Sequence, residues 1–381
     1  MIDYAYKNYC ISGIHTIHHN NGDLVPNGQQ EFQSLFTSDH WNEHIYSEIL
    51  NILSIPVTKS NVRSTQPNLD NRPVQVSSHT NLVTKIRNTL SSEFVKIISR
   101  DNEYFFLEPG LSRFNKFLLQ LKLGQIPKLW RPLNVPQVSY CPDSRDWQLG
   151  LCNLRIDNTY SGFLDVINSL IPKHIPKLYL EGYSCLQRLI ADSPWPSNPK
   201  LVFTISARVY QSDDYFKAWV AEKVDKKVPL VIGQHGGNFG TARWNFAEEH
   251  QIDISTNFLT WGWESFGRDN VQPFGVLTNY SHNVLPKKDG FALLVEMSLP
   301  RYSYHLYSAP VASGQWQSYF LDQCRFIRAL PPVIVDQVLV RLYRKGDYGH
   351  DQINRWQNRF PRINLDSGKD KISVLMRSSR I

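Results

Sequence analysis

The residues best suited to chemistry lie in one short glycine-rich segment near the middle of the chain. This segment holds Gln234, His235, Gly236, Gly237 and Asn238. Glycine lets the backbone approach a ligand closely, and an imidazole can donate, accept or remove a proton near neutral pH. The Lys-Ser/Thr ending of a P-loop and the spaced glycines of dinucleotide folds are both absent. The segment therefore predicts a polar binding loop, with a plain glycine turn around a buried histidine as the alternative.

Acidic side chains follow this loop. Glu248 and Glu249 stand beside His250, Asp253 comes next, and the motif WGW follows at residues 261–263. Carboxylates beside histidines are the materials of general acid–base catalysis, and burial among aromatic side chains raises a carboxyl pKa. Charges four residues apart on a solvated helix explain Glu249 and Asp253 equally well. Both interpretations stay open.

A strand, a helix and a second strand must position the loop. The apolar run LVFTIS at residues 201–206 predicts a buried strand, and PLVIG at residues 229–233 predicts another. Between them Asp213 and Asp214 open an amphipathic helix, whose dipole favours acids at its N-terminus. Such a unit pairs its strands in parallel, so the loop leaves the sheet at the carboxyl edge, where ligands bind in α/β folds.

The remaining pattern alternates in the same way. Helical spacing predicts helices at residues 38–53, 82–98, 111–130, 160–171 (ending at Pro172) and 316–330, and apolar runs predict strands at residues 258–261, 291–297 and 338–343. In the helix of residues 111–130, one stripe holds Phe114, Phe117, Leu118 and Leu121. The sequence therefore predicts an α/β protein.

The composition limits the class of protein further. The 381 residues are 41% hydrophobic, which is too rich for a disordered chain, and at roughly 150 residues per domain they suggest about two domains. The formal charge is +7, but no run of lysines and arginines marks a nucleic-acid surface. We therefore expect no nucleic-acid partner.

The cysteines and the N-terminal residues bear on redox state and location. The five cysteines are scattered without zinc-site spacing, so we expect them to be reduced and expect no metal. His15, His18 and His19 lie in a polar stretch without acidic partners, which favours a loop over a metal site. Neither a signal-peptide pattern nor a long apolar run occurs, so the expected location is the cytoplasm.

Several segments together carry a resemblance to a known family. They are residues 179–183 (YLEGY), 203–204, 216–219 (FKAW), 234–240 (QHGGNFG), 248–250, 261–263 (WGW), 300–302 (PRY) and 340–343 (VRLY). The chain resembles, over residues 100–380, bacterial transferases encoded in surface-polysaccharide (lipopolysaccharide or O-antigen) gene clusters. These are related in plan to glycosyltransferases with two Rossmann-like lobes (GT-B). The resemblance implies transfer of a sugar, such as an ulosonic acid on a CMP-activated donor, to a growing saccharide, with no cofactor besides the donor.

On this hypothesis the site residues fall into two groups. The catalytic group is His235, at the reacting centre or acceptor hydroxyl, with Asp214, Glu248 or Glu249 as base or nucleophilic carboxylate. Substrate-binding residues are expected at Gln234, Gly236, Gly237, Asn238, Glu181, Arg301, Tyr302 and Arg341. Arg301 and Arg341 would neutralise a phosphate or carboxylate of the donor. No metal is expected, since residues 212–214 (SDD) are better explained as a helix cap than as a D-x-D site.

The resemblance also implies a division of the chain. We expect a polar N-terminal region with one helix at residues 1–80, an acceptor-side α/β lobe at 81–280 and a donor-side lobe at 281–381, joined through residues 271–290. Thr256 and Asn257 stand where the family has an acid before the WGW motif. No further strand-and-helix unit is expected beyond the strand that carries Arg341, so the second lobe is expected to be partial.

Two other functions stay open. A partial second lobe and ten tryptophans also suit a non-catalytic saccharide-binding or scaffold protein derived from such a transferase. A hydrolase using His235 is weaker, because the sequence lacks the G-x-S-x-G elbow. Residues 287–381 contain 15 Lys and Arg against 8 Asp and Glu. This excess suits an anionic donor, or peripheral contact with an inner membrane that bears a lipid-linked acceptor.

Overall fold

The computed structural model describes most of the chain and divides it into two compact units. The described residues are 8–17, 22, 24–60, 101–145, 161–206, 212–236, 239–243, 245–277, 285, 287–297, 302, 313–343 and 351–380. The first unit comprises residues 1–67, 77–236 and 248–279, and the second comprises residues 68–76, 237–247 and 280–381. Helices alternate with strands that pair in parallel, which confirms the α/β class. The two-lobe plan and its boundaries at residues 80 and 280 stay predictions.

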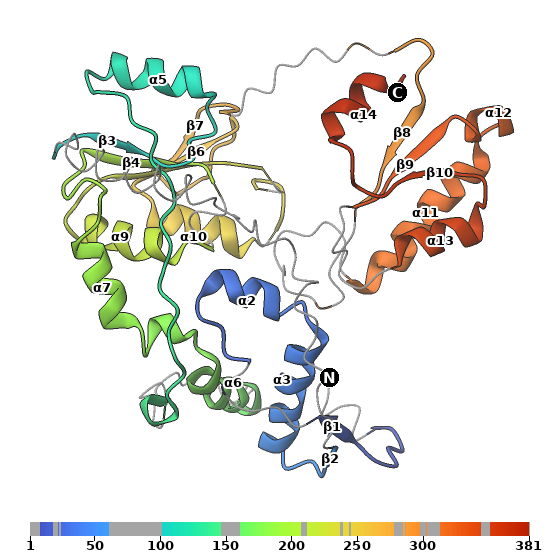
Figure 1. Ribbon diagram of the computed structural model, residues 1–381, viewed down its shortest axis with the longest axis horizontal. Helices are drawn as coiled ribbons and strands as arrows, with labels where there is room; N and C mark the ends of the chain where they lie inside the picture. The colour runs from blue at the N-terminus through green and yellow to red at the C-terminus, as the bar shows by residue number, and fades with distance from the viewer. Residues whose placement is uncertain are drawn as a thin grey trace, which may run out of the picture. The chain divides into compact units, whose positions relative to one another are not determined.

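A five-stranded parallel sheet organises the first unit. Its strands lie in chain order (Figure 1): β3 (Tyr104–Phe106), β4 (Leu201–Thr204), β5 (Leu230–Gly233), β6 (Asn257–Thr260) and β7 (Val271–Pro273). The predicted strand–helix–strand unit is confirmed as β4, α9 (Asp214–Asp225) and β5. Asp213 caps α9, since its carboxylate accepts a hydrogen bond of 2.9 Å from the Phe216 N–H. All five carboxyl ends therefore meet at one edge, which also receives the predicted binding loop.

Helices cover both faces of this sheet. Figure 1 shows α9 and α10 (Phe246–Ile254) on one face and α5 (Arg113–Lys122) on the other. Side chains of consecutive strand residues alternate between faces. Phe105 accordingly lies 4.7 Å from the Trp219 ring of α9, whereas Phe106 joins Phe203 in an apolar cluster against α5. The sheet is therefore buried on both sides, as its continuous apolar strands require.

The predicted helix around residues 111–130 is confirmed as α5, but its apolar stripe is exposed. Phe114, Phe117, Leu118 and Leu121 face solvent, with 37–68% of their surface accessible. The residues that are buried or packed on the sheet are instead Lys116, Leu119 and Gln120 of α5, with Leu123 directly after the helix. The side chains of the inner face therefore include two polar groups.

Further helices and a small sheet complete the first unit. These elements are β1 (His15–Ile17), α2 (Gln29–Leu35), α3 (Asp39–Ile52), β2 (Thr58–Ser60), α6 (Ser161–His174) and α7 (Tyr183–Ala191), with β1 and β2 in parallel. The structure confirms α3, whose cap Ser38 accepts from the Trp41 N–H. The prediction that Pro172 ends its helix is wrong, because α6 continues to His174. The predicted helix at residues 82–98 lies outside the described residues, as do His18 and His19.

The second unit has its own parallel sheet and core. Its strands are β8 (Ala292–Val295), β9 (Val338–Arg341) and β10 (Asn364–Asp366), with β9 in the centre. Its helices are α11 (Trp316–Ala329), α12 (Pro332–Val335), α13 (Gln352–Arg359) and α14 (Ile372–Ser378). Trp316, Phe320 and Trp356 pack against the strands in its core. The expectation that no unit follows the strand of Arg341 is wrong, because α13 and β10 follow β9 and β10 pairs with it.

None of the described helices combines the length and the apolar character that crossing a membrane requires.

Candidate functional site

The binding loop and the WGW motif form one structure at the carboxyl edge of the first sheet. Gln234 directly follows β5 and is buried. Its side-chain Oε1 accepts hydrogen bonds from the Trp261 backbone N–H, at 3.0 Å, and from the Trp263 Nε1–H, at 2.8 Å. The Gln234 carbonyl in turn accepts from the Trp261 Nε1–H at 3.0 Å. One buried amide therefore joins the ends of β5 and β6.

Thr260 connects the same edge to β7. Its hydroxyl donates to the Trp263 carbonyl at 2.5 Å and accepts from the Gly262 N–H at 3.2 Å. Its carbonyl accepts from the N–H groups of Phe274 and Gly275, at 3.2 and 2.9 Å. Three consecutive strand ends are thus held together by hydrogen bonds, which gives this edge a preorganised backbone.

Two glycines let the backbone turn at this edge. Gly236 has φ +144° and Gly262 has φ +113°, a region that residues with a side chain rarely adopt. A Cβ at Gly236 would lie 3.9 Å from the Trp261 ring. The positive φ angles therefore explain why glycine stands at these two positions. Both interpretations of the segment, a binding loop and a plain glycine turn, predict this.

His235 lies between Gln234 and Gly236 and is partly buried. This burial lowers the pKa of His235, because the interior disfavours its charged form. The imidazole is accordingly neutral near pH 7, the form in which it can accept a proton from a hydroxyl. Gly237 and Asn238, which were predicted to bind substrate, lie outside the described residues.

Asp214 is engaged within the fold. Its buried carboxylate accepts from the Gln29 N–H and from the Lys217 Nζ, both at 2.8 Å, and from the Tyr179 hydroxyl. A Cβ at Gly28 would come within 2.3 Å of its Oδ2, so the chain needs glycine there. These contacts join the start of α9 to the start of α2. A catalytic role for Asp214 stays a prediction, but its carboxylate already has three internal donors.

The other predicted acids of the first unit also have partners. Glu181 forms a buried ion pair with Arg145, at 2.7 Å. On α10, Glu249 and Asp253 both bind the partly exposed Arg268, at 2.5 and 2.6 Å. The latter arrangement supports the interpretation of a charged, solvated helix face. The structure thus brings Gln234, His235 and Gly236 together with the WGW motif, whereas the contacts described for Asp214 and Glu181 lie elsewhere in the unit. Glu248 is partly buried on α10.

In the second unit, charged groups lie where the strands end. Arg341, the last residue of β9, pairs with Asp366, the last residue of β10. A charge in an otherwise apolar strand needs a partner, and Asp366 is that partner for Arg341. Glu296 directly follows β8, and its carboxylate accepts a hydrogen bond of 2.8 Å from the Trp356 Nε1–H. Sequence reasoning missed Glu296 and Asp366, although each lies at the end of a strand. Tyr302 is partly exposed, and Arg301 lies outside the described residues.

Replacement of Gln234 tests the amide that joins the two motifs. We expect Gln234→Leu to lower the free energy of unfolding by about 2–3 kcal/mol, since it leaves the N–H groups of Trp261 and Trp263 without an acceptor. Urea unfolding followed by tryptophan fluorescence measures the change. Gln272→Leu is the matched control, because Gln272 is exposed and should change stability by less than about 0.5 kcal/mol. Equal stabilities for both variants would contradict the proposed joining role.

Comparisons with known proteins give one match. A family model described as LIC12162 family transferase matches residues 1–381. The searches of curated proteins and of solved structures find no match.

Within the described part of the chain, no group of three or more histidine, cysteine, aspartate or glutamate side chains could hold a metal ion.

Proposed function

Because the chain belongs to the LIC12162 family of transferases, we propose that the group it transfers is a sugar. The donor is a nucleotide-activated sugar, with a CMP-activated ulosonic acid as the first to test, and the acceptor is a saccharide of a surface polysaccharide. The observation that carries this proposal is a neutral, partly buried His235 on a loop braced at the carboxyl edge of a parallel sheet. That edge is where α/β folds bind nucleotides and sugars.

The chemistry asked of His235 is proton transfer. Its imidazole accepts the proton of an acceptor hydroxyl while that oxygen bonds to the anomeric carbon of the donor. The bond from this carbon to the donor phosphate breaks, and the nucleotide leaves with the electron pair. In the second unit, Arg341 neutralises a phosphate or carboxylate of the donor, and Asp366 holds its guanidinium in place. The proposed place of work is the cytoplasmic side of the inner membrane.

Exposed aromatic side chains favour a second candidate, a saccharide-binding protein without turnover. Trp261 is 39% exposed and Phe274 is 65% exposed, and both follow strands that end at the same edge. Aromatic faces suit sugar rings whether or not chemistry follows. Turnover therefore separates the two candidates, whereas saccharide binding does not.

Donor binding tests the proposal. We expect titration calorimetry with CMP-, UDP-, GDP- and dTDP-activated sugars to give heat with one donor. Arg341→Lys should weaken that binding by about tenfold, because lysine keeps a cation beside Asp366 but lacks the planar fork of arginine. Arg325→Lys, on the exposed face of α11, is the matched control. Heat with none of the donors would contradict the proposal, and saccharide binding without turnover would favour the second candidate.

A further inference from the structure

Helix α5 carries apolar side chains on two opposite faces. On the inner face, Leu119 and Leu123 pack in the cluster of Phe106 and Phe203. On the outer face, Phe114, Phe117, Leu118 and Leu121 are spaced i, i+3, i+4 and i+7, and each is more than a third exposed. A surface helix of a globular domain ordinarily has a single apolar stripe, which faces the core. The second stripe of α5 is therefore available to something outside this unit.

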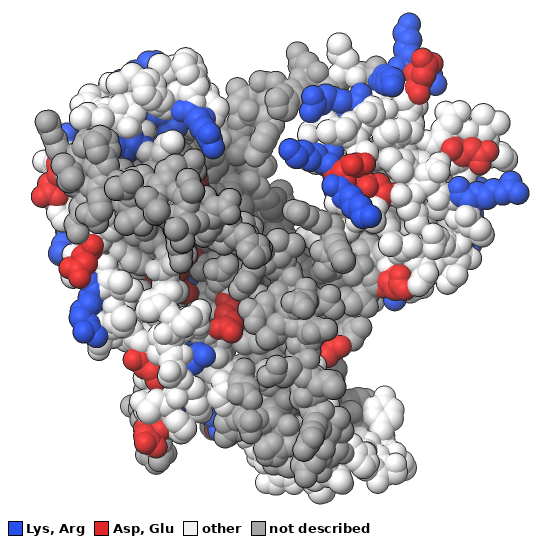
Figure 2. Space-filling view, in the orientation of Figure 1, with Lys and Arg blue, Asp and Glu red and all other residues white. Residues whose placement is uncertain are grey.

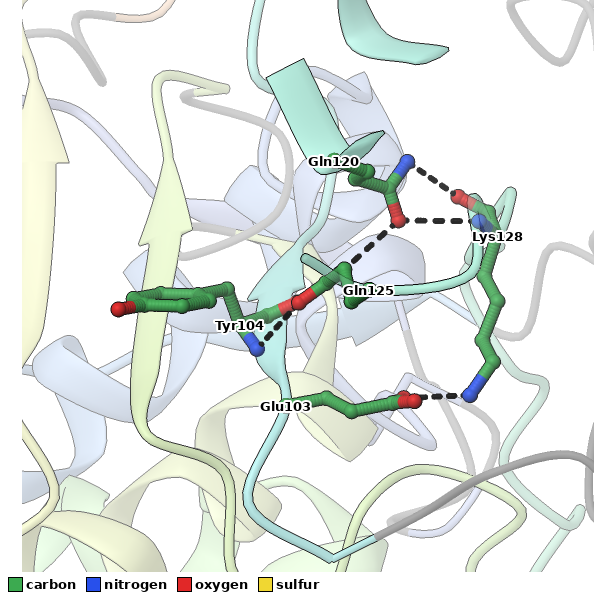
Figure 3. A network of polar contacts seen from close by, with 5 residues as sticks. All are labelled: Glu103, Tyr104, Gln120, Gln125 and Lys128. Carbon is green, nitrogen blue, oxygen red and sulfur yellow. Dashed lines mark hydrogen bonds and ion pairs between the residues drawn. The ribbon is translucent and has the colours of Figure 1, made fainter. Parts of the chain in front are cut away.

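Hydrogen bonds fix which face of α5 points outward (Figure 3). The buried Gln120 side chain donates to the carbonyls of Lys116 and Lys128, at 3.2 and 3.1 Å, and accepts from the Lys128 N–H at 2.9 Å. The Gln125 side chain accepts from the Tyr104 N–H at 2.8 Å and donates to the Tyr104 carbonyl at 3.0 Å. It thereby pairs with the backbone of β3, as a neighbouring strand would.

A buried ion pair completes this anchor. Lys128 binds Glu103, and neither side chain is more than 8% exposed. A rotation of α5 that buried its outer stripe would withdraw Gln120 from its partners and leave buried polar groups unsatisfied, which is costly. The exposure of the outer stripe is therefore a stable property of the fold.

The charged residues of the segment that contains α5 have one sign. Residues 109–142 contain no aspartate or glutamate, and Arg113, Lys122 and Arg131 are exposed among them. At about 100° per residue, Arg113 and Lys122 lie on opposite flanks of the outer stripe. Figure 2 shows the surface over α5 as white and blue without red. Two more exposed apolar side chains, Ile126 and Leu129, follow α5.

We propose that this α5 surface, formed by Arg113, Phe114, Phe117, Leu118, Leu121 and Lys122, docks on a membrane that contains anionic lipids. Phenylalanine and leucine between flanking cations are typical of helices that lie in the interface of a bilayer. The apolar stripe enters the acyl boundary while the cations meet the anionic headgroups. A protein partner of ordinary composition would not require that the acidic residues be absent from the whole segment. This inference goes beyond the proposed sugar transfer and does not depend on it.

Sedimentation with vesicles tests the proposal. We expect the wild-type protein to bind vesicles of equal parts phosphatidylglycerol and phosphatidylcholine, and to bind phosphatidylcholine alone at least about tenfold more weakly. Phe114→Ser with Phe117→Ser should weaken binding by about a hundredfold, about tenfold for each aromatic ring withdrawn from the interface. Phe163→Ser with Phe326→Ser is the matched control, because both of these rings are exposed on other helices. It should bind as the wild-type protein does.

The charge is tested separately. Arg113→Glu with Lys122→Glu should weaken binding to the anionic vesicles by at least about 25-fold, about fivefold for each cation lost. Arg188→Glu with Lys200→Glu makes the same charge change at exposed positions elsewhere in the first unit and should have a much smaller effect. Circular dichroism shows whether each variant is folded. Donor calorimetry tests the transferase proposal separately, so that a loss of vesicle binding can be distinguished from a failure of that proposal.

Three results would overturn the proposal. They are equal binding to both kinds of vesicle, equal binding by the α5 variants and their controls, and no binding by the folded wild-type protein. A dimer that light scattering detects in the wild-type protein, and that Phe114→Ser with Phe117→Ser abolishes, would assign the surface to a second copy of the chain instead.

Discussion

Replacing Arg145 with methionine is expected to lower the free energy of unfolding by about 3–5 kcal/mol. The Arg145 guanidinium donates to both carboxylate oxygens of Glu181, each at 2.7 Å. It also donates to the carbonyls of Pro172, Lys173 and Ile175, at 2.9–3.2 Å. These carbonyls lie at and directly after the end of α6, where a helix has no intrahelical donors for them. One cation thus joins the segment that ends at residue 145, the end of α6 and the segment before α7.

The cost arises from the charge that the variant leaves behind. Burial raises the pKa of Glu181, but the Arg145 hydrogen bonds and the backbone N–H groups outweigh it, so the pKa is lowered overall. A carboxyl group whose pKa is lowered by folding stabilises the fold at pH values above its ordinary pKa. This stability is lost as the pH falls through the lowered pKa. The difference between wild type and Arg145→Met should therefore be largest near neutral pH and shrink in acid.

Two comparisons isolate the effect in guanidinium unfolding. Arg145→Met with Glu181→Met removes both charges and should recover part of the lost stability, because no unpaired buried charge remains. Arg268→Met removes a cation that binds two carboxylates at the surface, and it should cost less than about 1 kcal/mol. If Arg145→Met were as mild as Arg268→Met, the buried ion pair would not be what joins the three segments.

The parts of the fold that the sequence predicts are those with local signals. The unit β4–α9–β5 combines two apolar runs with an acidic cap, and all of these lie within 35 residues of sequence. By contrast, β3 and β7 have only three residues each, and β7 ends in a proline. Such short strands are stabilised by their neighbours in the sheet rather than by a pattern of their own. Residues 104–106 and 271–273 form strands because they pair with β4 and β6, and the local sequence pattern does not contain that information.

The candidate site shows the same division. The motifs around His235 and Trp261 stand out in the sequence, but the amide of Gln234 that joins them acts over 27 residues. Asp214 and Glu181 are predicted as a catalytic and a substrate-binding acid, whereas their partners in the structure, Gln29 and Arg145, are 185 and 36 residues away. A carboxylate that binds substrate and one that holds the fold together have the same side chain. Only the contacts across the chain distinguish them.

For helix α5, the sequence predicts the element but not the face that is buried. The spacing of Phe114, Phe117, Leu118 and Leu121 correctly predicts a helix, because period and propensity are local properties. Which face is buried depends on contacts with groups outside the helix. Here Gln120, which bonds to the Lys128 backbone, is buried together with Lys116. An apolar stripe therefore identifies a surface that needs a partner, but it does not tell whether that partner is the core or a membrane.

His235→Gln is expected to lower turnover by about 10²–10⁴-fold if His235 is the general base of sugar transfer. Glutamine keeps a polar side chain of similar size but cannot accept the proton. Since burial lowers the pKa of His235, the wild-type imidazole stays neutral down to a pH below its ordinary value of 6.5. The acid limb of kcat/KM should therefore lie below pH 6.5, with activity falling as the pH drops through the lowered pKa.

The variant should lose this limb together with the rate, while donor binding measured by calorimetry stays within about threefold of wild type, because only the proton acceptor is gone. His250→Gln, at an exposed position on α10, is the matched control and should keep both rate and pH profile. A neutral imidazole that merely fills a glycine turn would produce a different result. Turnover and its acid limb would then survive in His235→Gln, and the base would have to be sought among the remaining predicted acids, Asp214, Glu248 and Glu249.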